Sequence, residues 1–376
     1  MESKIIPFYC PEDKWIVKSC DCILYDSDGK QYIDFESGVW CANLGHSNDR
    51  IVKLMESQIK ESIHQGYKFC NHSAESLSEE LQELIGFENG ASVFLSSGSE
   101  AINMAVTLSQ HFSGRKKIVK TDHSYLSAYG HGQISPDNEN MVSVRLNDMQ
   151  SIEDIDFKEI AAFVVETGGA SFGVVKFPDN DFINRVAELC IENNCLIIAD
   201  EVTTGMGRMG KWFGFKYYDL LPDMVVTGKA LGNGYPVSAV TVSSKVLEGF
   251  AQNPFRYAQS HQNDPLGCAI GLEVIKTIRE NDLINTCLKT GQYFSGQLEL
   301  LKEKHPDKIK EVRARGLMLA LELNDGTDGE VISGKLFQSG FVVGYRNNVL
   351  RFLPPFTIQT REINQLIETI DTLLTD

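Results

Sequence analysis

Short apolar runs alternate with helical patterns through the middle of the chain. The apolar runs are rich in β-branched residues, as buried strands are, and the longer segments between them repeat apolar residues with helical spacing. The predicted strands are Ser92–Leu95, Lys117–Lys120, Met141–Arg145, Ala161–Glu166, Leu196–Asp200, Met224–Thr227 and Ser238–Val242. The predicted helices include Glu100–Phe112, Asp181–Asn193 and Pro265–Glu280. This alternation predicts an α/β fold with a mostly parallel central sheet, flanked by helices and binding ligands beyond the carboxyl ends of its strands.

The two ends of the chain have a different pattern. Near the N-terminus, the strand candidates Cys22–Tyr25 and Gln31–Phe35 flank Asp28-Gly29, a hairpin signal. The C-terminal part reads as the helix Leu283–Lys304, the strands Arg313–Leu323, Phe341–Tyr345 and Val349–Leu353, and the closing helix Arg361–Leu374. We therefore expect a large domain at residues 47–262 and a smaller α+β domain formed by residues 1–46 and 263–376.

Composition narrows the class of protein. The chain has 376 residues, of which 42% are hydrophobic and 23% charged, as in a soluble globular protein. The net charge of −16 argues against nucleic-acid binding, which needs clustered Lys and Arg. The nine cysteines contain no C-x-x-C, which suggests reduced thiols. We find neither a signal-peptide core nor an apolar stretch of the ~20 residues that span a bilayer, so we expect a cytoplasmic protein without membrane contact.

Lys229 is the most informative candidate for chemistry. It follows the apolar run Met224–Thr227 and precedes a glycine-rich turn, while Asp200 ends another apolar strand 29 residues upstream. A lysine and a carboxylate at two strand ends suit pyridoxal phosphate, because an amine forms its Schiff base and an Asp pairs with its protonated pyridine nitrogen. Most lysines are surface charges and acids are common at strand ends, so each residue alone also permits a structural interpretation.

Ser97, Gly98 and Ser99 form a candidate phosphate site. They lie between a predicted strand and a predicted helix, where free N–H groups and the helix dipole favour an anion. Gly98 lets the backbone approach a ligand closely. The alternative is a helix that is merely capped by Ser97 and Glu100, and this motif by itself favours that alternative.

Three further side chains are candidates for a flat cofactor and its substrate. Val202 follows Asp200 closely and could cover one face of the ring, and Tyr125 could stack on the other. Arg351 interrupts an apolar strand, and its guanidinium could bind a carboxylate in bidentate fashion. Plain packing for Tyr125 and a structural salt bridge for Arg351 remain open alternatives.

Two other kinds of site are disfavoured. Residues 205–210 match G-x-G-x-x-G, but this turn neither follows a strand directly nor opens a convincing helix, so a dinucleotide site is not expected. The histidines, including His123 and His131, lack metal-ligand spacing with a supporting acid, so we predict no metal.

Together these segments resemble the class III pyridoxal-phosphate aminotransferases of fold type I, a family that includes ornithine, acetylornithine and 4-aminobutyrate aminotransferases. The resemblance runs nearly end to end and rests on the order and spacing of several short motifs. These are Tyr32–Gly38 with Leu44–His46, Ser97–Ala101, Asp200–Val202 with Thr204–Arg208, Gly228–Gly232, His261–Leu266, and Leu350–Phe352 with Pro354 and Pro355.

The resemblance implies a ping-pong aminotransferase that moves an amino group from an amino acid or ω-amine donor to a 2-oxo acid. Lys229 and Asp200 would be catalytic, and Arg351, Trp40 and the position of Ser171 would face the substrate. The implied cofactor contacts are Ser97, Gly98, Ser99, Tyr125, Glu166, Asp200, Val202, Thr203, Lys229 and Ser260. Ser260 would reach the phosphate of the neighbouring subunit, which implies a homodimer with active sites at its interface.

Departures from the family pattern bear on the substrate. Tyr125-Leu126-Ser127-Ala128 stands where relatives have an aromatic residue followed by His-Gly-Arg. Ser171 replaces a glutamate that can pair with the counterpart of Arg351, and Thr203 replaces a common Gln near the 3-oxygen of the cofactor. The absence of a clear second carboxylate-binding arginine favours a donor with a single carboxylate or an ω-amine.

Three rival functions remain open. A racemase or epimerase of the same family would return the proton to the opposite face of Cα without a keto acid. A non-catalytic protein that binds pyridoxal phosphate would have no need for Lys229, Asp200 and Arg351 together. A nicotinamide oxidoreductase would lack a lysine-bound cofactor.

Overall fold

A seven-stranded sheet forms the centre of this computed structural model, which describes residues 4–6, 8, 12–130, 133, 138–169 and 175–375. In order across the sheet, the strands are β4 (Ala91–Leu95), β10 (Ser238–Val242), β9 (Met224–Thr227), β8 (Leu196–Asp200), β7 (Ile160–Glu166), β5 (Lys117–Thr121) and β6 (Met141–Val144). Among these described strands only β10 runs antiparallel to its neighbours. The predicted mostly parallel sheet is confirmed, and its predicted strands lie within about one residue of those observed.

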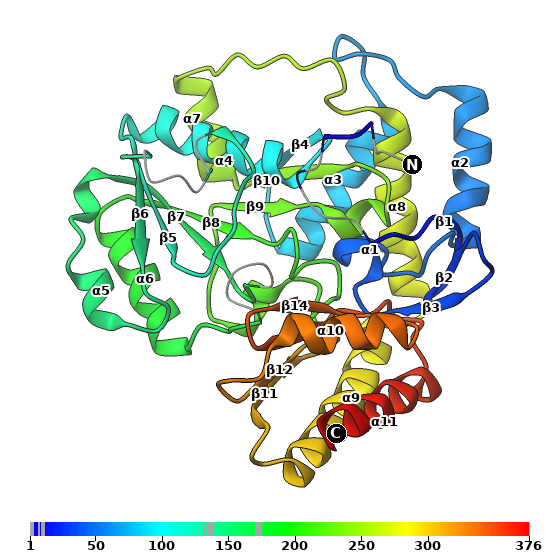
Figure 1. Cartoon of the computed structure of the whole chain (residues 1–376). Coiled ribbons are helices and arrows are strands. Elements are labelled where there is room, and N and C mark those ends of the chain that lie inside the picture. The colour runs from blue at the N-terminus through cyan, green and yellow to red at the C-terminus, as the bar shows by residue number, and fades with distance from the viewer. Residues whose placement is uncertain are drawn as a thin grey trace.

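Helices cover both faces of this sheet (Figure 1). On β7, Phe163 and Val165 pack into one core with α3 (His72–Ile85), α6 (Asn180–Glu192) and α8 (Pro265–Glu280). The alternate residues Ala162 and Val164 pack into a second core with α4 (Gly98–Ser113) and α7 (Ser244–Gln252). Because side chains alternate across a strand, a fully apolar strand such as β7 needs cover on both faces.

The chain ends form two smaller sheets, one to the right of the central sheet in Figure 1 and one below it. The first contains β1 (Ile16–Cys20), β2 (Ile23–Asp26), β3 (Gln31–Asp34) and β13 (Phe341–Val342). The second contains β11 (Ile309–Arg315), β12 (Met318–Leu323), β15 (Val349–Phe352) and β14 (Gly344–Arg346). The parallel pairing of β3 with β13 joins the N-terminal segment to the C-terminal part, and the predicted hairpin is the β2–β3 pair.

The remaining elements connect or cover these sheets. The longer ones are α2 (Asp49–Glu61), α9 (Leu283–Lys304), α10 (Gly329–Gln338) and α11 (Thr360–Thr375). The shorter ones are α1 (Ser37–Trp40), α5 (Met149–Glu153), η2 (Phe157–Glu159), η3 (Gly214–Tyr217) and η4 (Lys229–Gly232). The predicted domain boundary remains a proposal, and α8, which it assigns to the small domain, packs against α2 and α3.

Two predicted strands were wrong in extent. The run Arg313–Leu323 is a hairpin that turns at Gly316, whose φ of 56° favours glycine and where a Cβ would lie 2.6 Å from the backbone of Met209. The run Phe341–Tyr345 divides into β13 and β14, which belong to different sheets. An apolar pattern alone does not locate such breaks, because each run continues in sequence from one strand into the next without a polar interruption long enough to mark a turn.

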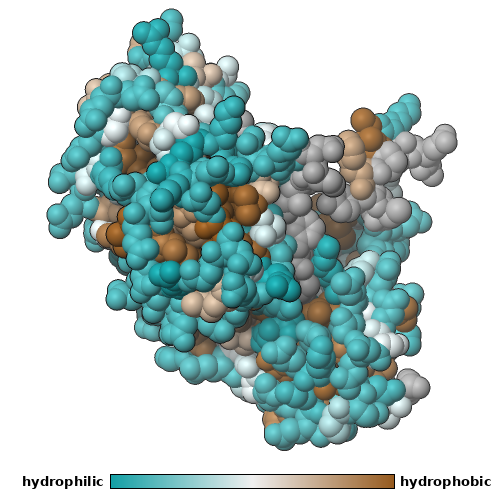
Figure 2. Space-filling view, turned by 90° about the vertical axis from the view of Figure 1, so that its left-hand side faces the viewer, coloured by the Kyte–Doolittle hydropathy of each residue, from teal (hydrophilic) through white to brown (hydrophobic). Residues whose placement is uncertain are grey.

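One side of the molecule is shown in space-filling form in Figure 2. Most of this face is hydrophilic, with a hydrophobic patch near its centre. Within the part of the chain that the structure describes, no helix combines the length and apolar character needed to cross a bilayer.

Candidate active site

The ends of β4, β7, β8 and β9 surround a cavity of about 150 Å³ at one edge of the central sheet. Its lining residues are Ser97, Gly98, Ser99, Tyr125, Leu126, Glu166, Asp200, Val202, Thr203 and Lys229. Nine of the ten cofactor contacts expected from the sequence therefore lie together, although they come from separate parts of the chain. Parallel strands place their carboxyl ends on the same edge, which explains this convergence.

Lys229 presents a partly buried amine to this cavity. It begins the short helix η4, with a left-handed φ of 42° that is uncommon for a residue with a side chain. Its Nζ donates a hydrogen bond to Thr203 Oγ1 at 2.8 Å and lies 4.7 Å from the centre of the Trp40 ring. Burial lowers the pKa of the amine, while the nearby charge of Asp200 opposes that shift. A lysine with a lowered pKa can act as a nucleophile and as a base.

Two buried carboxyl groups stand side by side in the same cavity. Glu166 and Asp200 end the adjacent parallel strands β7 and β8, where they are direct register partners. Burial raises the pKa of both groups, and the charge of Asp200 raises that of Glu166 further. Lys229 is the cation that opposes both shifts. Two acids facing one amine leave this end of the cavity favourable for another positive group, such as a protonated pyridine nitrogen.

Another part of the cavity suits an anion. The Ser97 side chain caps helix α4 by accepting a hydrogen bond from the Glu100 N–H at 3.2 Å, and the 16-residue helix begins at Gly98. A Cβ at position 98 would lie 2.7 Å from Val202 Cγ1, so only glycine fits between the helix start and Val202. The predicted capping arrangement is thus present, and it leaves the helix N-terminus directed at the cavity.

The groups that line the cavity therefore fit pyridoxal phosphate. The helix N-terminus would hold the phosphate, the acid pair would face the ring nitrogen, and the amine of Lys229 borders the same cavity. Backbone contacts hold both acids in place, because the N–H of Val202 donates to Asp200 at 3.1 Å and the N–H of Tyr125 donates to Glu166 at 3.3 Å. Leu126, which also lines the cavity, was not expected from the sequence.

Arg351 forms a salt bridge, the alternative that the sequence left open, and its partner Glu36 was not identified from the sequence. Its Nη2 lies 3.2 Å from Oε2 of Glu36, and its Nε lies 3.3 Å from both carboxylate oxygens. The Trp40 indole N–H donates to the same carboxylate at 3.2 Å, and Arg351 Cζ lies 4.6 Å from the Trp40 ring. Glu36 and Arg351 are 315 positions apart, so no local signal could have paired them.

Trp40 and Glu36 are positioned by an unusual turn. Residues Ser37, Gly38, Val39 and Trp40, labelled α1 in Figure 1, have φ values of 41°, 60°, 59° and 67° and form a left-handed turn. Each non-glycine residue in this conformation costs roughly 1–2 kcal/mol. The Asp34 carboxylate accepts hydrogen bonds from the N–H groups of Glu36 and Gly38, both at 2.8 Å. Strain of this kind is often retained at functional sites.

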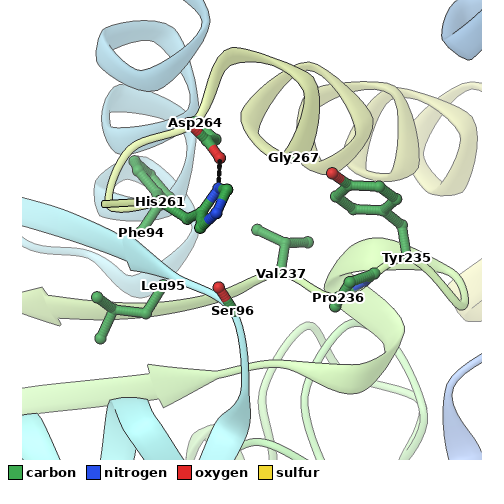
Figure 3. Close-up of a pocket in the computed structure, with 9 residues that line it drawn as sticks. All are labelled: Phe94, Leu95, Ser96, Tyr235, Pro236, Val237, His261, Asp264 and Gly267. Carbon is green, nitrogen blue, oxygen red and sulfur yellow. Dashed lines mark hydrogen bonds and ion pairs between the residues drawn. The ribbon is translucent and has the colours of Figure 1, made fainter. Parts of the chain in front are cut away.

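Four expected site residues are not placed among those that line the cavity. Trp40 and Arg351 lie beside it, because the Trp40 ring contacts both Lys229 Nζ and the Arg351 guanidinium. Ser171 lies outside the described residues. Ser260 is exposed and does not line the cavity of its own chain. The next residue, His261, borders a separate cavity of about 260 Å³ between the end of β4 and the loop Tyr235–Val237, and Figure 3 shows its hydrogen bond to Asp264.

A histidine cluster near Ser260 also escaped sequence reasoning. Asp264 accepts from His64 Nδ1 at 2.5 Å and from His261 Nδ1 at 2.6 Å, and the candidate ligand atoms of these three residues lie within 4.8 Å of one another. His64 is distant in sequence from the other two, so spacing alone gave no sign of the group. The observed contacts are hydrogen bonds around one carboxylate, with both imidazoles exposed.

Comparisons with known proteins add independent findings. The family described as "Aminotransferase class-III" matches residues 11–135 and 125–374. An uncharacterized aminotransferase of Archaeoglobus fulgidus is 31% identical over 360 residues, which cover 92% of this chain and 84% of the relative. The acetylornithine aminotransferase of Clostridium acetobutylicum is 31% identical over 364 residues, covering 92% of each protein. A crystal structure of the acetylornithine aminotransferase from Elizabethkingia anophelis matches with a TM-score of 0.87 at 27% identity, covering 98% of this chain and 96% of the other.

Proposed function

Because the chain belongs to the class-III aminotransferases, we propose that the cavity around Lys229 and Asp200 is the active site of this pyridoxal-phosphate-dependent enzyme. The enzyme transfers an amino group from an amino donor to a 2-oxo acid. The observation that carries the assignment of the site is one cavity that joins a buried amine, an acid pair and a helix N-terminus. No finding favours the racemase, the non-catalytic binder or the oxidoreductase.

Each group around the cavity has a role in this proposal. Bound pyridoxal phosphate supplies an aldehyde carbon for the amino group and a ring that withdraws electrons from the donor's Cα. Lys229 Nζ holds the cofactor at rest and then carries the proton to and from Cα. Asp200, assisted by Glu166, stabilises a proton on the ring nitrogen. Thr203 holds Nζ through its 2.8 Å hydrogen bond, and Trp40 covers the amine from one side and limits its contact with water.

The substitution Lys229→Ala tests this assignment. We expect turnover to fall by at least roughly 10²–10⁴-fold, because the proton carrier at Cα is lost. Borohydride treatment followed by peptide mass spectrometry should place the cofactor's mass on Lys229 in the wild type and nowhere in the variant. Lys216→Ala is the matched control, since Lys216 is partly buried and bonds the Ile85 carbonyl away from the cavity. Retention of full activity in Lys229→Ala would refute the site.

We also propose a homodimer whose subunits share their active sites. The exposure of Ser260 supports this, because a residue remote from its own cavity is free to serve a neighbour. Ser260→Ala should weaken cofactor binding by about tenfold, the cost of a hydrogen bond to a charged group. Mixed dimers of Lys229→Ala and Ser260→Ala should regain activity at limiting cofactor, because one of their two sites has both residues. A monomer in sedimentation, or no gain over the separate variants, would exclude shared sites.

A cytoplasmic location is likewise proposed. The eight cysteines in the described part of the chain are all free thiols, which supports a reducing compartment. Cell fractionation followed by immunodetection tests this directly, and recovery of the enzyme outside the cytoplasm would contradict it.

A further inference from the structure

The Glu36 carboxylate lies directly against Gly344. Gly344 is the register partner of Arg351 on the neighbouring strand β14. A Cβ at position 344 would lie 2.4 Å from the carboxylate carbon and from Oε1 of Glu36. Glycine at this position therefore allows Glu36 to approach the guanidinium of Arg351 side-on.

The backbone that carries Glu36 is held firmly. Asp34 accepts hydrogen bonds from the N–H groups on both sides of the turn, and its own carboxylate contacts His46 Nε2 at 2.8 Å. The following residue, Ser37, accepts a hydrogen bond from buried Arg208 at 3.0 Å. Glu36 is thus a fixed partner of Arg351 rather than a group on a loop that can swing away.

We propose that Glu36 takes the place of a substrate carboxylate on Arg351, so that carboxylate-bearing substrates must compete with it while donors without a carboxylate do not. This inference rests on the proposed function, because it assumes that the cavity beside Lys229 receives the substrate. Trp40 links the two regions, since its ring contacts both Lys229 Nζ and the Arg351 guanidinium.

Electrostatics supports this competition. The Glu36 carboxylate is buried and already bonded to Arg351 and to the Trp40 indole, so its charge is neutralised in place. A second carboxylate would share one guanidinium with Glu36 at close range, and like charges in a buried site repel strongly. A neutral carbon chain meets no such penalty. The site therefore favours a donor whose transferred amine lies on a chain without a carboxylate beside it.

The substitution Glu36→Gln isolates the charge of this residue. Glutamine keeps an oxygen that can accept the Trp40 N–H, so the Trp40 ring beside Lys229 stays in place. We expect the KM for a 2-oxo acid such as pyruvate to fall by about tenfold, and the KM for an alkylamine donor such as butylamine to change less than about twofold. Calorimetry of the holoenzyme with propionate, a carboxylate that cannot react, should show a Kd lowered by the same factor.

Two further variants complete the test. Gly344→Ala should displace the Glu36 carboxylate sterically and lower the propionate Kd in the same direction without altering residue 36. Glu322→Gln removes a carboxylate that pairs with Lys310 and Arg313 rather than with Arg351, and it should leave both KM values unchanged. Circular dichroism and thermal melting confirm that each variant folds.

The result that overturns the proposal is equally defined. If Glu36→Gln weakens propionate binding, Glu36 orients Arg351 for carboxylates instead of competing with them. If both KM values change by the same factor, the residue acts only on the shape of the cavity. Wild-type enzyme that transfers no amino group from any donor would refute the proposed function, whereas the propionate titration would still decide the role of Glu36.

Discussion

At the scale of single residues, the acid pair of the cavity is held where its ionised form is unfavourable. Asp200 and Glu166 are buried beside each other, and burial raises the pKa of both carboxyl groups. Glu201, the next residue after Asp200, is also buried, and burial raises its pKa to about 7. A cation near the acid pair would lower the free-energy cost of ionising these buried acids. The same groups that destabilise the cofactor-free protein would therefore favour binding of a protonated ring.

A pH dependence of stability follows for the cofactor-free protein. Acids with a raised pKa bind protons in the folded state at pH values where the unfolded chain, with pKa values near ~4, has released them. Stability should therefore fall as pH rises from about 4 through the folded pKa values, and part of that fall should disappear in Asp200→Asn. Thermal melting from pH 5 to 8 measures this slope.

Asp200→Asn should stabilise the cofactor-free protein at neutral pH but weaken its binding of the cofactor. Asp200→Asn should bind pyridoxal phosphate more weakly, because the partner of the ring nitrogen has lost its charge. The exposed Glu88→Gln is the control and should reproduce the wild-type slope and affinity. An unchanged pH slope in Asp200→Asn would show that the carboxyl group is ionised at no cost in the empty protein.

At the scale of elements, the left-handed turn α1 makes the sharpest prediction. Val39 has φ of 59° and ψ of 47°, and 62% of its surface is exposed, so it gains little packing in return for its strain. Val39→Gly should stabilise the protein by roughly 0.5–1 kcal/mol, since the relieved strain exceeds the entropy that glycine adds to the unfolded chain. Urea unfolding monitored by circular dichroism measures the change.

A matched substitution provides the control. Val52 is also exposed but lies within the ordinary helix α2, where glycine is less favourable. Val52→Gly should therefore destabilise the protein by about 0.5 kcal/mol. If both variants are destabilised alike, the turn carries no relievable strain at Val39.

Sequence patterns identified most of the central sheet. They also led to Lys229 and Asp200, but not to Glu36 as the partner of Arg351. Strands β8, β9 and β10 were predicted with their observed bounds, because a fully buried strand is a continuous apolar run. Asp200 and Lys229 could be predicted because they lie at or just after the ends of such strands, whereas Glu166, Thr203 and Ser260 were expected only from the resemblance to the aminotransferase family. Glu36 could not be predicted, because its partner Arg351 comes from the far end of the chain and the pairing depends on how two sheets meet.

The backbone conformation of residues 37–40 also could not be predicted from the sequence pattern. Residues 37–40 contain one glycine, and nothing in Ser-Gly-Val-Trp signals four consecutive left-handed residues. The turn is held by two local hydrogen bonds to the Asp34 carboxylate and by a tertiary contact from Arg208, and together these contacts override the local preferences of the residues. Sequence reasoning about single segments has no access to such contacts.

At the scale of the whole molecule, Arg208 joins parts that are distant in sequence. Its fully buried guanidinium donates to the Leu317 carbonyl at 3.1 Å and to Ser37 Oγ at 3.0 Å, and it also bonds Asn43 and the Pro354 carbonyl. The glycine-rich stretch 205–210 that carries it forms a buried turn and opens no helix, as its sequence context suggested. The turn serves to connect the central sheet to both smaller ones.

Removal of this guanidinium should be costly. Arg208→Met would leave several buried acceptors without a donor, and we expect the free energy of unfolding to fall by about 3 kcal/mol or more. Chemical denaturation measures the loss. Arg185→Met is the comparison, because Arg185 makes its ion pairs with Glu153 and Glu188 at the surface and should cost less than about 1 kcal/mol. Equal losses in the two variants would contradict the connecting role of Arg208.

The antiparallel direction of β10 limits the mobility of the backbone that carries Lys229. The chain leaves β9 at Thr227 and enters β10 at Ser238, so the segment bearing Lys229 is clamped at both ends by hydrogen-bonded neighbours. The other strands that border the cavity lead into a helix, as β4 does, or into longer connections, as β7 and β8 do. This short connection between β9 and β10 has little freedom to move, so backbone amides near residue 229 should exchange slowly with solvent deuterium. In the proposed mechanism, Lys229 would therefore move its amine by rotating its side chain while the main chain stays in place.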